Sequence, residues 1–476
     1  MHHLARKDHQ HVWHPFTQMQ DWCKEEPIVI MNGKGAEVED QHGRCYLDAN
    51  ASIWTNLHGH GHPHINRSIR RQLGKIAHSS ALGLANEPAS LLADQLVRNA
   101  NPAKLFRKKS TTLKNTRLNK VFFSDDGATA MEAAFKLAYE HARRSGRSKK
   151  PKFLSIDHAY HGDTIGAVSV GQVDLFHRSF AGLLFPTDKV MSPYCYRCPF
   201  NRAKPDRAEA RQTRKCQWEC IGKIEKRFEA IDKKKQAYAG FVFEPVIQGV
   251  AGMIVQPKGW LQRAATLARQ AQTPLIADEV MTGFGRTGSM FASHQEGVQP
   301  DFLCLAKGMT GGYLPMAATL TTQAVYDSFL GPYDAFKSFF HGHSYTGNQL
   351  GASASLASLE LLKTPGAAVK RRALACEFKE ALNGLWASPY VGDVRHAGLV
   401  AGVELVRDWR TRATWEWKKQ VGIRVCREMA RQGVLTRPIG NLIVLMPPYC
   451  CSSRQIRKMV EALSRSIDIV LGKKRV

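Results

Sequence analysis

The stretch Leu275-Ile-Ala-Asp-Glu-Val-Met-Thr-Gly-Phe-Gly-Arg-Thr-Gly288 combines a short apolar run, a carboxylate and several glycines. A second stretch, Phe302-Leu-Cys-Leu-Ala-Lys-Gly-Met-Thr-Gly-Gly312, repeats this order with an amine in place of the acid. Each apolar run has the length of a buried strand, and the glycines that follow favour a turn. We therefore predict that Asp278 and Lys307 stand at the ends of two buried strands and face each other across one cleft.

Short apolar runs recur from about residue 121 and alternate with amphipathic stretches, a pattern typical of an α/β sheet flanked by helices. We expect strands at 121–124, 153–157, 240–244, 275–278, 302–305 and 316–320, and helices at 130–144 and 352–362. Shorter mixed elements follow at 391–394, 398–404 and 442–445. This change in pattern predicts a second, smaller domain towards the C-terminus.

The pair Asp278 and Lys307 indicates a cofactor. Pyridoxal phosphate needs an amine for a Schiff base and an acid that keeps its pyridine nitrogen protonated. Lysine is seldom fully buried unless it is paired or functional, and burial lowers the pKa of its amine, which favours the reactive neutral form. The alternative is that Lys307 extends to solvent and Asp278 only ends a strand. The linked motifs favour pyridoxal phosphate.

Two further motifs fit the same cofactor. Ser124-Asp-Asp-Gly-Ala-Thr-Ala-Met-Glu132 predicts a strand, a turn and a helix start, and N–H groups at a helix N-terminus bind phosphate well. Its alternative is an ordinary turn capped by an aspartate. Tyr160 follows another expected strand and can stack on a flat ring, or it can be a buried tyrosine in a polar turn. Glu244 also follows a strand, where it can neutralise a cation or gate substrate entry, and its alternative role is to cap a helix.

The composition narrows the class of protein. The 476-residue chain has 43% apolar residues, and neither a membrane span nor a secretory signal is visible in it, so we expect a cytoplasmic location with no membrane partner. The net charge of +26 is compatible with a nucleic-acid surface, but no nucleic-acid motif accompanies it, and a solvated basic surface is the simpler interpretation. The Lys- and Arg-rich segment 104–120 predicts an exposed excursion.

Eleven cysteines without a secretory signal indicate reduced thiols. Cys195 and Cys198 form one close pair, and Cys216 and Cys220 form another, within a segment that lacks clear periodicity. Two such pairs can supply a tetrahedral zinc site, but the loop between them is rich in Lys and Arg. We expect free thiols or a disulfide-capable surface loop here, and no bound metal.

The stretches around Asp278 and Lys307 resemble the signature of class III, or omega-type, pyridoxal-phosphate aminotransferases, and the resemblance extends from about residue 10 to 470. It implies fold type I: a large domain with a mainly parallel seven-stranded sheet, and a small α/β domain built from both termini. Residues 1–80 and 353–476 then form the small domain, 81–352 the large domain, and about 192–222 an inserted surface loop. A homodimer with shared active sites is also implied.

The resemblance assigns roles to particular residues. Lys307 is the Schiff-base lysine, Asp278 the partner of the pyridine nitrogen, and Tyr160, beside His161, packs on the ring. Gly127 and Ala128 match the phosphate-binding turn, although the family usually has a hydroxyl residue where this chain has Ala128. The segment that contains Gly342, His343 and Ser344 resembles the one that reaches the cofactor phosphate of the neighbouring subunit.

The two ends of the chain narrow the resemblance to one branch of the class. The segments 11–19, 50–54, 58–63, 436–440 and 445–449 resemble members that convert 8-amino-7-oxononanoate to 7,8-diaminononanoate in biotin synthesis, usually with S-adenosylmethionine as donor. Arg437 then binds the substrate carboxylate, and Phe16, Ile53, Trp54 and Gly342 line the substrate pocket with Tyr160 and Lys307. Phe16 and Ile53 replace residues usual in the family, so lysine remains open as donor. The alternative is another omega-aminotransferase that acts on a diamine or an ω-amino acid.

Overall fold

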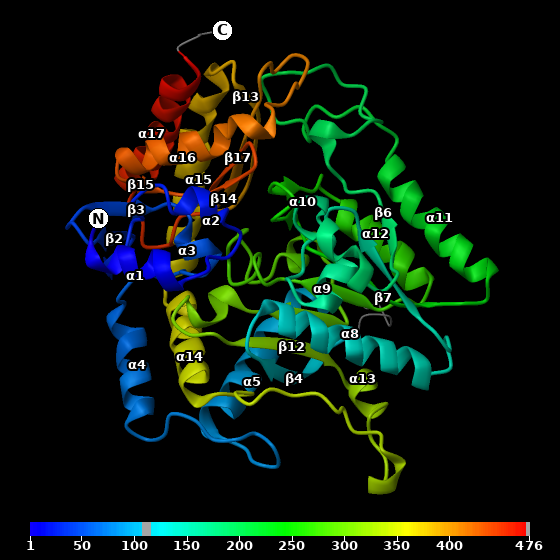
Figure 1. Ribbon diagram of the computed structural model, residues 1–476. Helices are drawn as coiled ribbons and strands as arrows, with labels where there is room; N and C mark the ends of the chain where they lie inside the picture. Colours follow the sequence, from blue (N-terminus) through cyan, green and yellow to red (C-terminus); the bar gives the residue numbers. More distant parts are fainter. Residues whose placement is uncertain (107–115, 473–476) are drawn as a thin grey trace.

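The computed structural model describes residues 1–106 and 116–472, and it contains a large domain around one seven-stranded sheet and a smaller domain with two four-stranded sheets (Figure 1). Residues 107–115 of the basic segment predicted at 104–120 lie outside the described residues. Among the described helices, none is both long and apolar enough to cross a membrane.

The large sheet has the order β4-β12-β11-β10-β7-β5-β6. Its strands are β4 (Leu118–Ser124), β12 (Ala317–Thr322), β11 (Phe302–Leu305), β10 (Leu275–Asp278), β7 (Tyr238–Phe243), β5 (Lys152–Ile156) and β6 (Asp188–Val190). Only β12 runs antiparallel to its neighbours, so the mainly parallel seven-stranded sheet is confirmed. The six expected strands are all present, whereas β6 was not predicted because three residues carry no readable pattern.

Helices cover both faces of this sheet, which explains why its central strands are apolar throughout. In β10, Leu275 and Ala277 face the core formed with α5 (Glu87–Ala100), α11 (Glu219–Lys233), α12 (Trp260–Gln270) and α14 (Gln349–Lys363). Ile276 faces the opposite core, with α8 (Gly127–Arg144) and α9 (Ile165–Val170). Successive side chains of a strand point to opposite faces, so one apolar run supplies two cores.

Both ends of the chain build the small domain, and they lie together at the upper left of Figure 1. One sheet joins β1 (Ile30–Lys34), β2 (Glu37–Asp40) and β3 (Cys45–Asp48) to β15 (Val434–Leu435), which runs parallel to β3. The other contains β13 (Val391–Ala397), β14 (Val400–Leu405), β17 (Leu442–Leu445) and β16 (Pro438–Ile439). Helices α15 (Ala367–Asn383), α16 (Val421–Arg431) and α17 (Ser453–Leu471) pack around a common apolar core.

The remaining elements are short helices and one hairpin. The helices are α1 (His3–His11), α2 (Met19–Trp22), α3 (Ala51–Trp54), α4 (Pro63–Leu73), α6 (Ala103–Phe106), α10 (Asp174–His177) and α13 (Gln323–Asp327). A hairpin of β8 (Ile247–Gln248) and β9 (Ile254–Val255) lies between the domains, because its Ile247 and Met253 share an apolar cluster with Val400 and Val444 of the small domain.

The segment 192–222 differs from the surface loop that we expected. Its Cys195 and Tyr196 are buried, and its arginines bond to carbonyl groups of the C-terminal part of the chain. Its last residues, from Glu219, already belong to α11. A segment without periodicity can still be buried when polar side chains anchor it, and composition alone did not reveal those anchors.

Candidate active site

Polar groups follow four strands of the large sheet at the same edge. β10 ends at Asp278, Asp125 and Glu244 come directly after β4 and β7, and Lys307 is the second residue after β11. In an open α/β sheet, ligands collect where the carboxyl ends of parallel strands meet. All four residues line one cavity of about 650 Å³, which brings the predicted pair Asp278 and Lys307 together.

Asp278 is buried and held in a defined orientation. Its Oδ2 lies 2.7 Å from His161 Nδ1, and its Oδ1 accepts a hydrogen bond from the Val280 N–H at 3.0 Å. The side chain of His161 is fully buried, and among the described residues its Nε2 has no hydrogen-bond partner. A carboxylate fixed in this way can be presented to a cationic ring nitrogen in the cavity.

Lys307 begins a short 3-10 turn with a φ of 43°, and this turn directs its amine into the cavity. Its Nζ lies 4.9 Å from the centre of the Trp54 ring. Burial lowers the pKa of Lys307, although Asp278 and Glu244 oppose this by favouring the charged amine. The net effect is a pKa below the ordinary lysine value, which increases the fraction of neutral, nucleophilic amine.

Glu244, expected from the sequence to neutralise a cation, gate substrate entry or cap a helix, also lines the cavity. Its Oε1 accepts from the Tyr160 N–H at 3.1 Å and its Oε2 from the Gly249 N–H at 2.7 Å. Burial nevertheless raises the pKa of Glu244 to about 7. Its position directly after a strand was the sequence signal, but that position suits many structural roles.

The predicted phosphate turn lies at the first turn of α8. Asp126 caps the helix by accepting from the Thr129 N–H at 2.9 Å, which leaves the N–H groups of Gly127 and Ala128 without helical acceptors. The turn is tightly enclosed, since a Cβ on Gly162, whose φ is 120°, would lie 2.3 Å from the Ala128 Cβ. Two free N–H groups and a helix dipole form a suitable anion site.

Two aromatic residues form walls of the cavity. The hydroxyl of Tyr160 donates to Asp163 Oδ2 at 2.7 Å, and its ring stacks on His177 with 6.0 Å between centroids and 14° between planes. The indole N–H of Trp54 donates to Asn50 Oδ1 at 2.8 Å. Both side chains are therefore fixed by hydrogen bonds that leave their rings available for packing.

Trp54 belongs to a turn of unusual backbone conformation. Residues 51–54 all have positive φ, from 45° at Ala51 to 72° at Trp54, a conformation that costs energy for residues other than glycine. Asp48 stabilises the turn by accepting from the Ser52 N–H at 3.1 Å and from the Ser52 hydroxyl at 2.8 Å. As a result, Trp54 lines the cavity of Lys307, while Ile53 lines a second hollow.

The second hollow, of about 600 Å³, contains Arg437 together with Ile53. These two predicted substrate residues thus do not share the cavity of Lys307, and the turn at 51–54 lies between the two spaces. Phe16 is outside both: it is 57% exposed, and its ring contacts Phe176 at 5.3 Å between centroids, beside the His177 that stacks on Tyr160.

The predicted residues Gly342, His343 and Ser344 do not line the cavity of their own chain. Gly342 and Ser344 are exposed, and the Ser344 carbonyl accepts from His78 Nε2 at 2.9 Å. His343 Nδ1 lies 3.6 Å from Asp125 Oδ2. In the single chain, the segment 342–344 therefore lies at the surface.

The four cysteines that raised the question of zinc surround one small internal space, which Cys195, Cys198, Cys216 and Cys220 all line. All of them are free thiols. Burial raises the pKa of Cys195 to about 12 and that of Cys220 to about 11. Within residues 1–106 and 116–472, no group of three or more Cys, His, Asp or Glu side chains is placed to hold a metal ion.

Comparison with known proteins identifies the family. The model of the class III aminotransferases matches residues 19–467. The chain belongs to this family. Adenosylmethionine-8-amino-7-oxononanoate aminotransferase of Geobacter sulfurreducens is 45% identical over 98% of this chain and 97% of its own length. The crystal structure of the Methanocaldococcus jannaschii enzyme of the same name has a TM-score of 0.87 at 37% identity and covers 98% of this aminotransferase and 99% of that chain.

A further relative connects the cavity to its cofactor. The amine transaminase of an uncultivated Pseudomonas species, solved with bound pyridoxal phosphate, has a TM-score of 0.85 and is 31% identical, over 96% of this chain and 98% of that one. The cavity of this aminotransferase suits the same group. Lys307 offers a buried amine, Asp278 a buried carboxylate, and the start of α8 two free N–H groups. The chain is thus a fold type I aminotransferase with a site for pyridoxal phosphate.

Glu244→Gln tests the electrostatics of the site. The folded protein keeps the Glu244 proton up to a pKa of about 7, whereas the unfolded chain loses it near the ordinary 4.5. The stabilising contribution is therefore complete below the unfolded pKa and is lost as the pH rises through the folded one. In urea titrations from about pH 5 to about pH 8, we expect the free energy of unfolding to fall less steeply in the variant than in the unchanged protein.

Glu461→Gln, on an exposed part of α17, is the matched control and should keep the original pH dependence. Equal slopes for Glu244→Gln and the unchanged protein would contradict the raised pKa.

Proposed function

We propose that this aminotransferase converts 8-amino-7-oxononanoate to 7,8-diaminononanoate in biotin synthesis, with pyridoxal phosphate as cofactor and S-adenosylmethionine or lysine as amino donor. The observation that carries the reaction type is the convergence of Lys307 and Asp278 in one cavity. Support for the substrate comes from relatives of that activity that match nearly the whole chain, in Geobacter sulfurreducens and Methanocaldococcus jannaschii. As a biosynthetic enzyme, the protein is expected in the cytoplasm.

The residues of the cavity divide the chemistry between them. Bound pyridoxal phosphate supplies an electron sink for a substrate carbanion. Lys307 Nζ, whose pKa is lowered by burial, would take the proton from the amino-bearing carbon of the substrate and return it later in the cycle. Asp278, oriented by His161, would hold the ring nitrogen of the bound cofactor protonated. Trp54 and Tyr160 pack the ring and exclude water.

The second hollow suits the far end of a long substrate. The acceptor carries a carboxylate at the end of an aliphatic chain, and a guanidinium binds two oxygens at once. Arg437 supplies that group, and the apolar Ile53, which belongs to the turn between the two spaces, lines the same hollow. We propose that the acceptor passes Trp54 with its reacting carbon near Lys307 and its carboxylate at Arg437.

A broader amine specificity is the alternative. The Pseudomonas amine transaminase shares the fold over almost the whole chain at 31% identity. An omega-aminotransferase for a diamine or an ω-amino acid would use the same Lys307 and Asp278. A comparison of acceptors distinguishes the two, because only the proposed reaction depends on a carboxylate at the far end of the acceptor.

We also propose a homodimer in which each subunit completes the other's site. Gly342 and Ser344 are exposed, and near them Phe336 and Phe340 are 70% and 75% exposed. Such exposed aromatic residues favour burial against a partner. In this arrangement the segment that carries His343 and Ser344 reaches the cofactor phosphate of the neighbouring subunit. Nucleic acid is not expected as a partner.

The decisive test is a donor screen. Purified enzyme with pyridoxal phosphate is incubated with 8-amino-7-oxononanoate and either S-adenosylmethionine or lysine, and 7,8-diaminononanoate is measured by mass spectrometry. We expect product with at least one donor, and Lys307→Ala should lose both turnover and the visible absorbance of the bound cofactor, because no other amine replaces it. Absence of product with every donor would refute the substrate, and full activity of Lys307→Ala would refute the mechanism.

Arg437→Met tests the second hollow. Loss of a charge-assisted hydrogen bond to the carboxylate should raise the KM for 8-amino-7-oxononanoate by about tenfold to a hundredfold, with a smaller change in kcat. The KM for the amino donor in the first half-reaction should stay the same. Arg454→Met, at an exposed position of α17, is the control. An unchanged acceptor KM in Arg437→Met would exclude this residue from substrate binding.

Phe340→Asp tests the shared site. A charge at this exposed aromatic position should oppose burial against a partner, so we expect a monomer by light scattering, with weakened cofactor retention. Val369→Asp replaces another exposed apolar residue, on α15, and should leave the mass and the activity unchanged. A Phe340→Asp protein that is still dimeric and fully active would place the interface elsewhere.

A further inference from the structure

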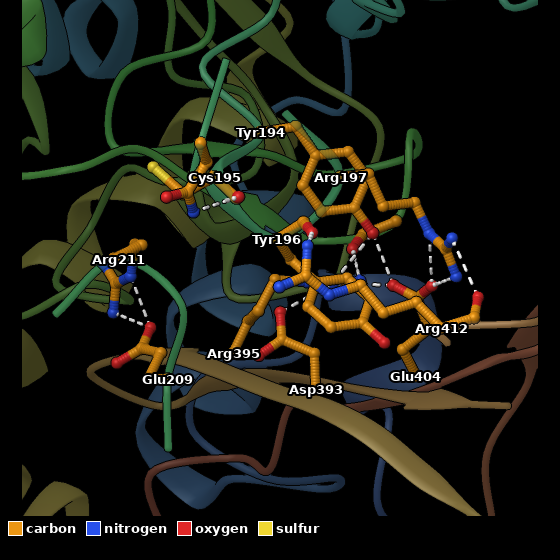
Figure 2. A network of polar contacts seen from close by, with 12 residues as sticks. Tyr194, Cys195, Tyr196, Arg197, Glu209, Arg211, Asp393, Arg395, Glu404 and Arg412 are labelled. Carbon is orange, nitrogen blue, oxygen red and sulfur yellow. Dashed lines mark hydrogen bonds and ion pairs between the residues drawn. The ribbon is translucent and has the colours of Figure 1, made fainter. Parts of the chain in front are cut away.

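A buried network of charges joins the inserted segment to the small domain (Figure 2). At its centre is Arg395 of β13, which is 3% exposed. One nitrogen of its guanidinium, Nη1, donates to Asp393 Oδ2 at 2.9 Å, to Glu404 Oε2 at 2.7 Å and to the Tyr194 hydroxyl at 2.8 Å. Buried charges are tolerated only when they are paired, so the position of this guanidinium is strongly determined.

The inserted segment contributes two side chains to this network. Figure 2 shows Tyr194 and Arg197 reaching Glu404 from the segment that precedes α11. Arg197 Nε donates to Glu404 Oε1 at 2.7 Å, and the Tyr194 hydroxyl donates to Glu404 Oε2. Glu404 is thus held by both parts of the chain. The insertion therefore fixes the carboxylate that in turn fixes Arg395.

The second nitrogen of the fork points towards the active site. Arg395 Nη2 donates to the Gly252 carbonyl at 2.8 Å. Gly252 lies in the turn of the β8–β9 hairpin, where the N–H groups of Gly252 and Met253 both donate to the Gly249 carbonyl, at 3.1 and 2.8 Å. The Gly249 N–H donates to Glu244, and Val250 lines the cavity of Lys307. Three consecutive hydrogen bonds therefore connect Arg395, through Gly252 and Gly249, to Glu244 in the cavity wall.

We infer that Arg395 is a positioning residue for the active site: its planar fork holds the Gly252 carbonyl and so fixes the turn 249–253 that forms one wall of the cavity. The inference rests on the proposed function. It gives the insertion a role in that function, because Tyr194 and Arg197 orient the fork through Glu404. The two nitrogens have separate tasks, charge neutralisation at Nη1 and backbone positioning at Nη2.

A substitution at Arg395 can separate charge neutralisation from positioning of the backbone. Lysine in place of Arg395 keeps a positive charge for Asp393 and Glu404, but its single ammonium lacks the planar fork that reaches carboxylate and carbonyl together. Arg395→Lys should therefore preserve much of the fold while it releases the Gly252 carbonyl. Arg412→Lys is the matched control, because Arg412 bonds to the Tyr196 carbonyl in the same interface and has no contact with the hairpin.

The experiment compares both variants with the unchanged holoenzyme by amide hydrogen exchange and steady-state kinetics. In Arg395→Lys, we expect faster exchange in the peptide that covers 245–256, and a KM for 8-amino-7-oxononanoate raised about tenfold with kcat changed much less, as for one lost charge-assisted hydrogen bond. Arg412→Lys should match the unchanged enzyme in both measurements. Tyr194→Phe, which removes one hydroxyl, should change both in the same direction by a smaller factor.

Unchanged exchange in 245–256 of Arg395→Lys would overturn the inference, and so would equal effects in Arg412→Lys, because the network would then only stabilise the domain interface. If Arg395→Lys does not fold, Tyr194→Phe decides by the same criteria. Turnover of the unchanged enzyme separately tests the proposed function. Hydrogen exchange reports on the hairpin whichever substrate the enzyme uses. Failure of the positioning role of Arg395 can therefore be distinguished from failure of the proposed function.

Discussion

The active site depends on keeping one amine and two carboxyl groups together out of water. Lys307, Asp278 and Glu244 lie at the carboxyl ends of parallel strands at one edge of the large sheet. Burial favours the neutral forms of Lys307 and Glu244, while the two carboxyl groups oppose this effect at Lys307 by favouring its charged amine. The balance leaves Lys307 with a lowered pKa and Glu244 with a raised one. A cofactor ring placed between them meets an available nucleophile and a fixed acid without solvent reorganisation.

The proposed substrate contacts lie in a different part of the molecule. The strained turn at 51–54 directs Trp54 to the cavity of Lys307 and Ile53 to the hollow of Arg437, so one short segment forms the wall between the two spaces. Its strain is offset by hydrogen bonds that Ser52 donates to Asp48 and Trp54 donates to Asn50. Because β3 pairs with β15, the N-terminal turn and the C-terminal arginine belong to one rigid unit.

The inserted segment links that unit to the large domain. Its polar side chains bond to the C-terminal sheet, and Arg395 extends the same network to the hairpin that supports Glu244. Such buried networks contribute less to net stability than to the uniqueness of one arrangement. In this enzyme, the network fixes the position of the hairpin that contributes to the cavity wall.

The sequence by itself determined the class of fold, the cofactor pair and the phosphate turn. The strands before Asp278 and Lys307 and the glycines after them are local signals, since strand length and turn chemistry depend on neighbouring residues. The same holds for Asp126 and Gly127 at the start of α8. Only the tertiary structure decided that Ile53 and Arg437 share a separate hollow, that His161 holds Asp278, and that Arg395 reaches Gly252. These relations join residues more than a hundred positions apart, and no local pattern encodes where a buried side chain finds its partner.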